Sequence, residues 1–210
     1  MKLYLSSYQL GNNPQALADL VGENKKVAII PNALDVYTDT ARRTISIQHE
    51  KDGLQQIGLI SEDLDLRHYF DKQDELKNKL ANFGAVWVLG GNTFTLRRAY
   101  KETGMDTWLQ EHRTDKEFVY AGYSAGVCVL SPSLKGLETV DSPNIVPEGY
   151  KPEVIWEGVD LIDFAFAPHF MSNHPESDAV NAEVEYYKKN GVEYKTLHDG
   201  EVIIIDTEVA

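Results

Sequence analysis

Two continuous apolar runs, each followed by a glycine-rich turn and a helical pattern, constrain the fold of this chain more than any other feature. The first run spans 85–89 and leads into the turn 90–92, Gly-Gly-Asn. The second spans 118–121 and leads into the turn 122–126, Gly-Tyr-Ser-Ala-Gly. A strand without polar alternation is expected to be covered on both faces, as in a parallel sheet flanked by helices. The pattern therefore predicts an α/β fold with three layers, α/β/α, around a mainly parallel central sheet.

The rest of the chain continues the alternation of strands and helices. Hydrophobic periodicity predicts further strands at 2–6, 26–31, 64–66 and 161–167, and helices at 13–20, 37–56, 105–112 and 176–189, with another helix capped by Asp71. The segments 192–197 and 202–206 are predicted to form a hairpin or adjacent strands joined at 198–200. The proline-rich segment 131–158 is predicted to be irregular, and the sequence leaves open whether it closes over a site. Because ligands of such sheets bind beyond the carboxyl ends of the strands, both glycine turns are expected at the site.

Length and charge limit the classes of partner. The 210 residues are consistent with one domain over 1–210, and 33 acidic against 20 basic residues give a net charge of −13. Basic residues cluster in nothing larger than a pair, so nucleic acid is not an expected partner. The apolar runs are far shorter than the about 20 residues that cross a bilayer. The single cysteine, Cys128, is interpreted as buried. Because one cysteine cannot form an internal disulfide and the amino-terminal segment is polar, a cytoplasmic protein is predicted. A homodimer is one alternative for the assembly.

Ser124, at the centre of the second turn, has two interpretations. In a Gly-x-Ser-x-Gly turn the chain bends sharply from strand to helix, so that the serine hydroxyl projects from the sheet as a nucleophile. The alternative is a small residue in a tight turn, because glycine and serine are common in turns. In the first interpretation the N–H of Ala125 and the N–H groups of 90–92 face a developing oxyanion. We favour the nucleophile, because the turn follows an apolar strand.

A serine nucleophile requires a base, and His169 is the predicted one. It comes directly after the apolar strand predicted at 161–167, so its ring is expected at the same edge of the sheet as Ser124. His174, in the polar loop that follows, is the reserve candidate. The histidines on the predicted helices are interpreted as surface or core residues, namely His49, His68 and His112.

The imidazole in turn requires a carboxylate that holds its tautomer. Asp199, in the turn before the last strand, is predicted to supply it, and its rivals are Glu201 and Asp163. No cofactor is required for this chemistry. A metal site is not expected either, because His169 and His174 are the only close pair of histidines and no cysteine or clustered carboxylate completes a zinc pattern.

Four motifs follow one another along the chain, LGGNTFTL at 89–96, AGYSAGV at 121–127, APHF at 167–170 and LHDG at 197–200. In this order they resemble the motifs of the peptidase E family of serine peptidases, the group containing aspartyl dipeptidase. The similarity spans essentially the whole chain. It implies a fold like that of class I glutamine amidotransferases, with serine in place of their cysteine. It also implies a Ser-His-acid triad in which Ser124 and His169 match the family's positions and the acid, a Glu in the family, falls on Asp199. Oxyanion donors are implied at Gly91 and Ala125.

The stretch after the histidine departs from the family pattern. Aspartyl dipeptidases are expected to hold the acidic side chain of the substrate with an arginine there, but 171–184 contains neither Arg nor Lys. Arg97 or its neighbour Arg98 is predicted to contact the substrate instead, together with Asn92, although arginines on a helix are more often solvated. The predicted function is hydrolysis of short peptides by a serine peptidase, with specificity for aspartyl peptides left open. The alternatives are hydrolysis of a non-peptide amide or ester, and a catalytically silent binding protein.

Overall fold

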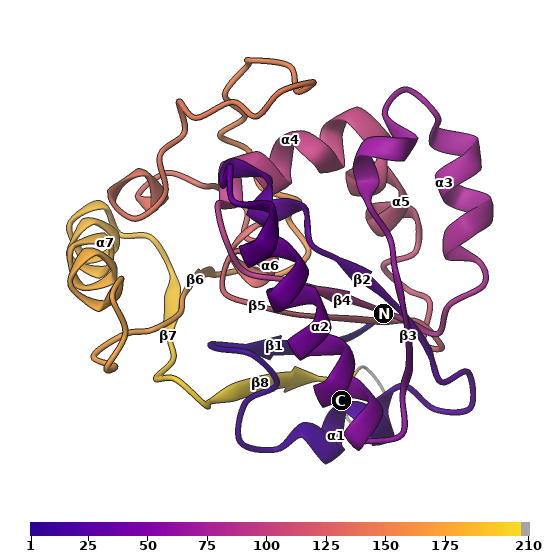
Figure 1. The fold of residues 1–210 in the computed structure, drawn as a ribbon. Coiled ribbons are helices and arrows are strands. Elements are labelled where there is room, and N and C mark those ends of the chain that lie inside the picture. Colours follow the sequence, from indigo (N-terminus) through magenta and orange to yellow (C-terminus); the bar gives the residue numbers. More distant parts are fainter. Residues whose placement is uncertain (207–210) are drawn as a thin grey trace.

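The computed structural model describes residues 1–206, which form a six-stranded central sheet and a separate two-stranded sheet (Figure 1). The strand order of the central sheet is β3-β2-β4-β5-β1-β8. Its strands are β1 (Lys2–Ser6), β2 (Lys26–Ile30), β3 (Ile60–Asp63), β4 (Ala85–Val88), β5 (Val119–Tyr123) and β8 (Val202–Ile205). All neighbouring pairs are parallel except β8 with β1. The predicted mainly parallel sheet is therefore confirmed.

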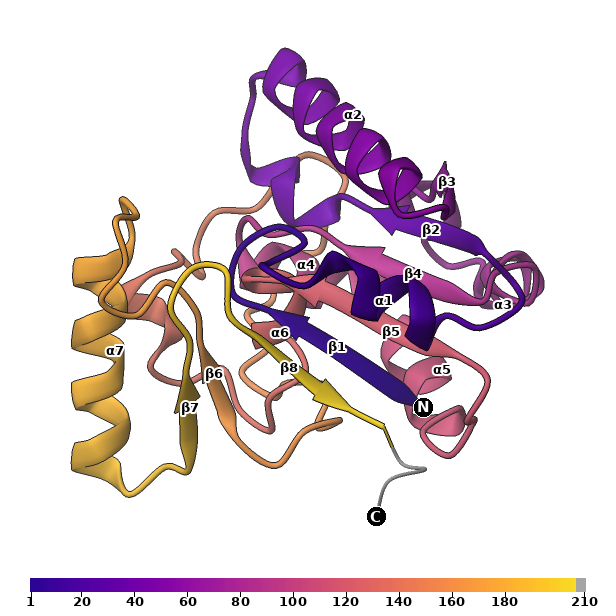
Figure 2. The ribbon, with the colours of Figure 1, turned by 90° about the horizontal axis from the view of Figure 1, so that it is seen from below.

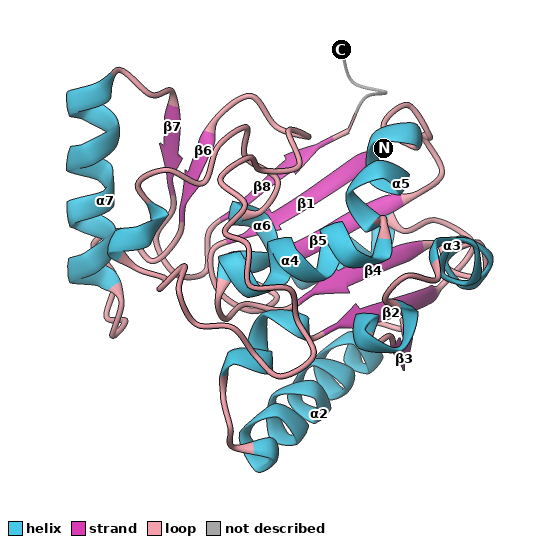
Figure 3. Ribbon diagram, turned by 90° about the horizontal axis from the view of Figure 1, so that it is seen from above, coloured by secondary structure: helices cyan, strands magenta, loops and turns pink. Residues whose placement is uncertain are grey.

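Helices cover both faces of the central sheet, as the three-layer prediction requires. One face carries α1 and α2, and the other carries α3, α4, α5 and α6 (Figure 2, Figure 3). Alternate residues of one strand enter the two cores, because Val86 packs on the second face and Trp87 on the first. None of the helices in residues 1–206 is long and apolar enough to cross a bilayer. The helix bounds are α1 (Pro14–Leu20), α2 (Thr40–Gln56), α3 (Gln73–Leu80), α4 (Thr93–Thr103), α5 (Met105–Glu111) and α6 (Ala125–Cys128), with 3-10 helices η1 (Asn32–Val36), η2 (Leu66–Tyr69) and η3 (Leu137–Thr139).

The two glycine turns leave neighbouring strands at the same edge of the sheet, as predicted. β4 pairs with β5 in the register that sets Val88 opposite Gly122. The chain after β5 then passes so close to β4 that a Cβ on Gly126 would lie 2.4 Å from Val88 O. Glycine is required at this approach because it carries no side chain.

A second sheet carries the remaining elements at one side of the molecule (Figure 1). β6 (Ala165–Ala167) and β7 (Tyr194–Thr196) pair in parallel and pack against α7 (Ser177–Asn190). The predicted pairing of 192–197 with 202–206 is therefore wrong, because β7 and β8 belong to different sheets. The chain does turn at 198–200, as predicted, but β8 pairs with β1, at the other end of the sequence.

Two local predictions are also wrong. The strand predicted at 64–66 lies at 60–63 instead, and it is an edge strand whose mostly exposed residues give little hydrophobic signal. Leu64 and Leu66 are buried just beyond its end. Asp71 does not cap α3, since its φ is +57° and the residue at the N-cap position is Lys72.

The proline-rich segment 131–158 lies over α4 and is bound to it by two buried arginines (Figure 3). Arg98 Nη2 donates to Pro143 O at 2.7 Å, and Arg97 Nε donates to Glu157 O at 2.7 Å. Both arginines are almost inaccessible, since Arg97 is 6% exposed and Arg98 is 1% exposed. The expectation of solvated charges is corrected, because irregular backbone has carbonyl groups that need donors and these guanidinium groups supply them.

One carboxyl group lies inside the core between α7 and the second sheet. Glu183 is 0% exposed and accepts a hydrogen bond from the Tyr187 hydroxyl, while its Oε2 has no partner among the described residues. Burial raises the pKa of Glu183 to about 8, against the opposing effect of the hydrogen bond from Tyr187. The group is therefore mostly protonated at neutral pH.

We expect Glu183→Gln to raise the thermal stability of the protein at pH 8 and to change it much less at pH 5. In the unfolded chain the glutamate ionises above its ordinary pKa of 4.5, whereas in the folded protein it stays protonated up to about 8. The free energy of unfolding therefore falls as pH rises through this interval, and glutamine, which does not titrate, removes that loss. Unfolding midpoints at both pH values measure the effect. The control is Glu185→Gln at an exposed position of α7, and equal shifts at pH 5 and pH 8 for Glu183→Gln would contradict the prediction.

Candidate active site

Ser124 lies between β5 and α6 in a backbone conformation that few non-glycine residues adopt. Its φ is +49° and its ψ is −121°, the kind of strain found where a nucleophile projects from a strand-to-helix turn. Hydrogen bonds fix both sides of the turn, since Ser124 N donates to Ser6 O at 3.3 Å and Ser124 O accepts from Val127 N at 2.8 Å. The conformation predicted from the sequence is thus held by the neighbouring strand and by the first turn of α6.

The first glycine turn lies beside this serine. A Cβ on Gly90 would lie 3.0 Å from Ser124 Cβ, and a Cβ on Gly91, whose φ is +142°, would lie 2.4 Å from Ala33 O. Within residues 1–206 the N–H groups of Gly91 and Ala125 donate no backbone hydrogen bond. These two groups, the predicted oxyanion donors, are therefore available to an anionic oxygen.

His169 and Asp199 meet at the edge where β6 and β7 end. His169 Nδ1 lies 2.6 Å from Asp199 Oδ1. Ser7, directly after β1, joins both to the central sheet, since its hydroxyl accepts from His169 N at 2.9 Å and donates to Asp199 Oδ1 at 3.3 Å. His169 has a φ of +59°, which these contacts maintain. Sequence reasoning missed Ser7, because a serine after a strand gives no signal of its own.

The rival carboxylates have other surroundings. Glu201 accepts a hydrogen bond from His198 N at 2.7 Å, and Asp163 is exposed. Within residues 1–206 the carboxylate that hydrogen-bonds the His169 ring is that of Asp199, whose own N–H donates to Ser172 Oγ at 2.8 Å.

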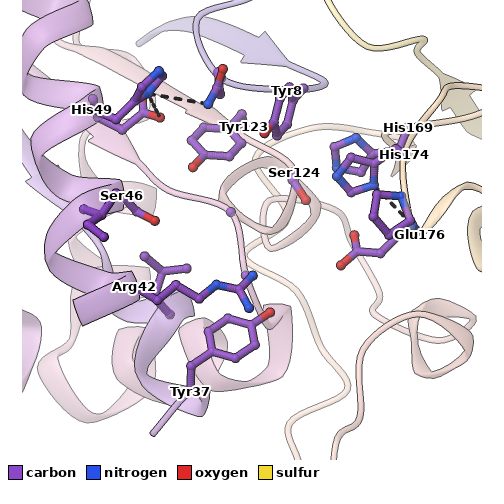
Figure 4. A pocket seen from close by; sticks show the side chains of 17 residues that line it. Tyr8, Tyr37, Arg42, Ser46, His49, Tyr123, Ser124, His169, His174 and Glu176 are labelled. Atoms are coloured by element: carbon purple, nitrogen blue, oxygen red, sulfur yellow. Dashed lines mark hydrogen bonds and ion pairs between the residues drawn. The ribbon is translucent and has the colours of Figure 1, made fainter. Parts of the chain in front are cut away.

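Ser124 and His169 line one pocket of about 430 Å³. Figure 4 shows both side chains on the side of the pocket that faces α2. The hydrogen bonds of His169 to side chains in residues 1–206 go from its backbone N–H to Ser7 and from Nδ1 to Asp199. Its second ring nitrogen, Nε2, is therefore left to accept a proton.

A second histidine and a glutamate surround the His169 ring. His174 stacks on it with ring centroids 3.7 Å apart and an angle of 7° between the planes, and Tyr8 packs edge-on against both rings. His174 Nδ1 accepts from Glu176 N at 3.2 Å. Potential ligand atoms of His169, His174 and Glu176 lie within 4.8 Å of one another. The expectation that no carboxylate clusters with the histidine pair is corrected, because the turn before α7 folds Glu176 back onto them.

Burial dominates the electrostatics of this cluster. It lowers the pKa of His169, against the hydrogen bond to Asp199, and the nearby His174 lowers that pKa further. Burial also lowers the pKa of His174 and raises that of Glu176. An imidazole with a lowered pKa is neutral at neutral pH, as a general base must be.

The opposite wall of the pocket comes from α2 and the residues before it, and sequence reasoning did not identify it. The Arg42 guanidinium lies 3.9 Å from the centroid of the Tyr37 ring. His49, interpreted from the sequence as a surface or core residue, lines the pocket 3.5 Å from Glu50 Oε1. The labelled side chains of this wall in Figure 4 are Tyr37, Arg42, Ser46 and His49.

The two predicted substrate contacts lie outside the lining of this pocket. Asn92 is 4% exposed and caps α4, its Oδ1 accepting from Thr95 N at 2.9 Å. Arg97 pairs with Asp106 at 2.9 Å beneath the irregular segment. Neither residue lines the pocket, because its polar atoms are already engaged in the fold.

We expect Gly91→Ala to destabilise the protein by about 3 kcal/mol, because a new Cβ meets Ala33 O in addition to the cost of the positive φ. The matched control is Gly58→Ala, where φ is +81° and nothing lies within 4 Å of a new Cβ. This control is expected to cost about 1 kcal/mol. Urea unfolding of both variants measures the difference, and equal losses would show that close packing does not determine the residue at position 91.

Comparison with known proteins agrees with the geometry. Residues 5–210 match the sequence profile of peptidase family S51. The chain is 28% identical over 187 residues to an uncharacterized peptidase of Listeria monocytogenes, which covers 89% of this chain and 85% of that protein. It is 27% identical over 194 residues to a Drosophila melanogaster protein named "Probable alpha-aspartyl dipeptidase", covering 89% of this chain and 71% of that protein.

Solved structures share the fold. A crystal structure of a protein assigned to peptidase E from Listeria monocytogenes matches with a TM-score of 0.75 at 25% identity and covers 98% of both chains. A peptidase from an acI-B1 Actinobacterium matches with a TM-score of 0.71 at 15% identity, covering 97% of this chain and 82% of that one, which shows the fold alone. The resemblance seen in the four motifs is confirmed: this chain belongs to peptidase family S51 and is a serine-type peptidase.

Proposed function

We propose that this protein hydrolyses short peptides through an acyl-enzyme, with Ser124 as nucleophile, His169 as general base and Asp199 as the carboxylate that orients the base. The main support is the hydrogen bond of 2.6 Å between His169 Nδ1 and Asp199 Oδ1. It fixes the imidazole tautomer so that Nε2 is the accepting nitrogen, in a ring that lines the same pocket as the serine.

In acylation, Ser124 Oγ attacks the carbonyl carbon of the scissile peptide bond and its proton passes to His169 Nε2. The carbonyl oxygen becomes an oxyanion, for which the N–H groups of Gly91 and Ala125 are the available donors. His169 then gives its proton to the leaving amine as the C–N bond breaks. A water molecule, deprotonated by the same imidazole, hydrolyses the acyl-enzyme and restores the serine.

Arg42 supplies the positive charge that an acidic group of the substrate requires. Among the described residues that line the pocket it is the one Arg or Lys. The stretch 171–184 contains neither residue type. The Drosophila relative carries the name of an aspartyl dipeptidase, so a carboxylate-binding group fits a pocket of this family. We infer that Arg42 takes this role from α2, across the pocket from His169.

The substitutions Ser124→Ala and His169→Gln are expected to lower kcat for dipeptide hydrolysis by about 10⁴-fold or more, because such residues act as a unit. Asp199→Asn keeps the size of the side chain but favours the wrong imidazole tautomer, so a loss of about 10⁴-fold is expected. Steady-state kinetics on a dipeptide library measure these effects, with circular dichroism to verify folding.

Matched controls for Asp199→Asn are Glu201→Gln and Asp163→Asn, both of which should retain the activity of the unchanged protein. Full activity of Asp199→Asn with a large loss in one control would transfer the role to that rival. Full activity of Ser124→Ala would refute the mechanism. Labelling of Ser124 by a fluorophosphonate with ester but no peptide hydrolysis would identify the alternative hydrolase, and neither labelling nor hydrolysis would identify a silent binding protein.

We expect Arg42→Met to raise KM about tenfold for dipeptides with an acidic side chain, because a hydrogen bond to a charged group contributes about 1.5 kcal/mol. The kcat for these peptides and the KM for neutral peptides should change little. Lys51→Met removes the same charge from another position of α2, where the lysine pairs with Asp63, and is the control. Equal KM changes for acidic and neutral peptides would exclude carboxylate recognition by Arg42.

A further inference from the structure

The cluster of His169, His174 and Glu176 has a composition that the proposed hydrolysis does not require. Serine acylation needs one imidazole, yet a second imidazole and a carboxylate lie against it, with potential ligand atoms within 4.8 Å of one another. Two imidazole nitrogens and one carboxylate oxygen with a position left open form a donor set that zinc accepts. The three side chains come from the end of β6 and the turn before α7, so a short stretch of chain supplies them all.

The nitrogen atoms that could bind an ion are the ones left without partners. His169 Nδ1 is engaged by Asp199, and His174 Nδ1 accepts from the Glu176 N–H. In both rings Nε2 remains as the available donor atom. The contact between Asp199 and His169 also has the form of the carboxylate–histidine pair that orients a metal-binding imidazole and strengthens it as a ligand.

We propose that His169, His174 and Glu176 bind a divalent transition-metal ion, with Zn²⁺ as the best chemical match, and that the bound ion inhibits the peptidase reversibly. Inhibition follows because the ion occupies His169 Nε2, the atom that receives the proton of Ser124. This consequence rests on the proposed function, whereas the binding of the ion does not.

A rearrangement of the His174 side chain separates the structure from a coordinating geometry. Ligand atoms at about 2.1 Å from a tetrahedral zinc ion lie about 3.4 Å apart, so the three groups must draw closer and the His174 ring must turn out of its stack on His169. His174 is partly exposed and lies in 171–176, a stretch of turns and bends without helix or strand. His169, fixed by Asp199 and Ser7, is the preformed half of the site.

The charge of the surroundings favours a cation. The carboxylates of Glu176 and Asp199 lie close to the two imidazole rings, and the whole chain carries a net charge of −13. Arg42 is the opposing charge, since it faces Glu176 across the pocket and partly offsets the rise that burial causes in the pKa of that carboxyl. Arg42 lies over the Tyr37 ring on α2 and belongs to the other wall, so it does not fill the space between the imidazoles.

Isothermal titration of the Ser124→Ala protein with ZnCl₂ tests binding without any dependence on catalysis. We expect one ion per chain and a loss of affinity of about 100-fold or more in both His174→Gln and Glu176→Gln, each combined with Ser124→Ala. His68→Gln, at an exposed histidine of η2, is the control and should leave affinity unchanged. Absence of binding at micromolar Zn²⁺ would overturn the site. So would variants of His174 and Glu176 that bind Zn²⁺ as tightly as Ser124→Ala does.

Titration with CoCl₂ identifies the ligands by their spectrum. We expect d–d bands of a nitrogen and oxygen donor set without the strong charge-transfer band of a thiolate, because Cys128 is buried at 2% exposed and its pKa is raised by burial. A thiolate band, or bands that persist unchanged in His174→Gln, would assign the ion to another position and refute the proposal.

Kinetics of the unsubstituted enzyme test the inhibition. ZnCl₂ should lower dipeptide hydrolysis, a chelator should restore it, and His174→Gln should raise the Zn²⁺ concentration needed for half-inhibition by about 100-fold. Binding of Zn²⁺ without loss of activity would refute the inhibitory role. If the enzyme hydrolyses no peptide at all, the proposed function fails, while the titrations of Ser124→Ala still decide whether the metal site exists.

Discussion

The parallel pairing of β4 with β5 is the constraint on which the whole site depends. It sets two glycine turns side by side, and Gly126 in α6 lies so close to Val88 of β4 that no side chain fits at its position. Ser124 then has to leave the sheet with a positive φ, and Gly91 presents its N–H beside it. The positive φ of Ser124 and the close packing around Gly91 and Gly126 therefore occur together at this edge of the sheet. They are also the features that a serine nucleophile and its oxyanion require.

His169, the base that we propose, is positioned by a different part of the fold. The small parallel sheet brings the residues after β6 and β7 to one edge, where His169 meets Asp199. Ser7 then connects this edge to the end of β1 with hydrogen bonds to both residues. The imidazole therefore depends on three segments that are distant in the sequence. Each of these segments follows closely on a strand, so the two sheets together position the ring.

The charged residues divide into those that hold the fold and those that face the pocket. Arg97 and Arg98 donate hydrogen bonds to carbonyl groups of the irregular segment 131–158. These two arginines, which follow the first glycine turn, are therefore not available to a substrate. Arg42 faces the pocket from α2, opposite the histidine and glutamate cluster. In a chain with a net charge of −13, Arg42 is the one Arg or Lys among the described residues that line the pocket, and we propose that it binds an acidic group of the substrate. The same imbalance favours a metal ion beside Glu176 and the two imidazoles.

The sequence by itself determined the class of fold, the two glycine turns, the elbow at Ser124 and the histidine and aspartate candidates, because continuous apolar runs and glycine positions are local signals. It could not determine that β8 pairs with β1, that the arginines of α4 are buried, or that Arg42 and His49 line the pocket. Segments far away in the chain determine which strands pair and which charges are buried. They also determine which face of a helix lines a site. The tertiary structure alone decided these, because hydrogen-bond donors and acceptors are matched in space and not along the sequence.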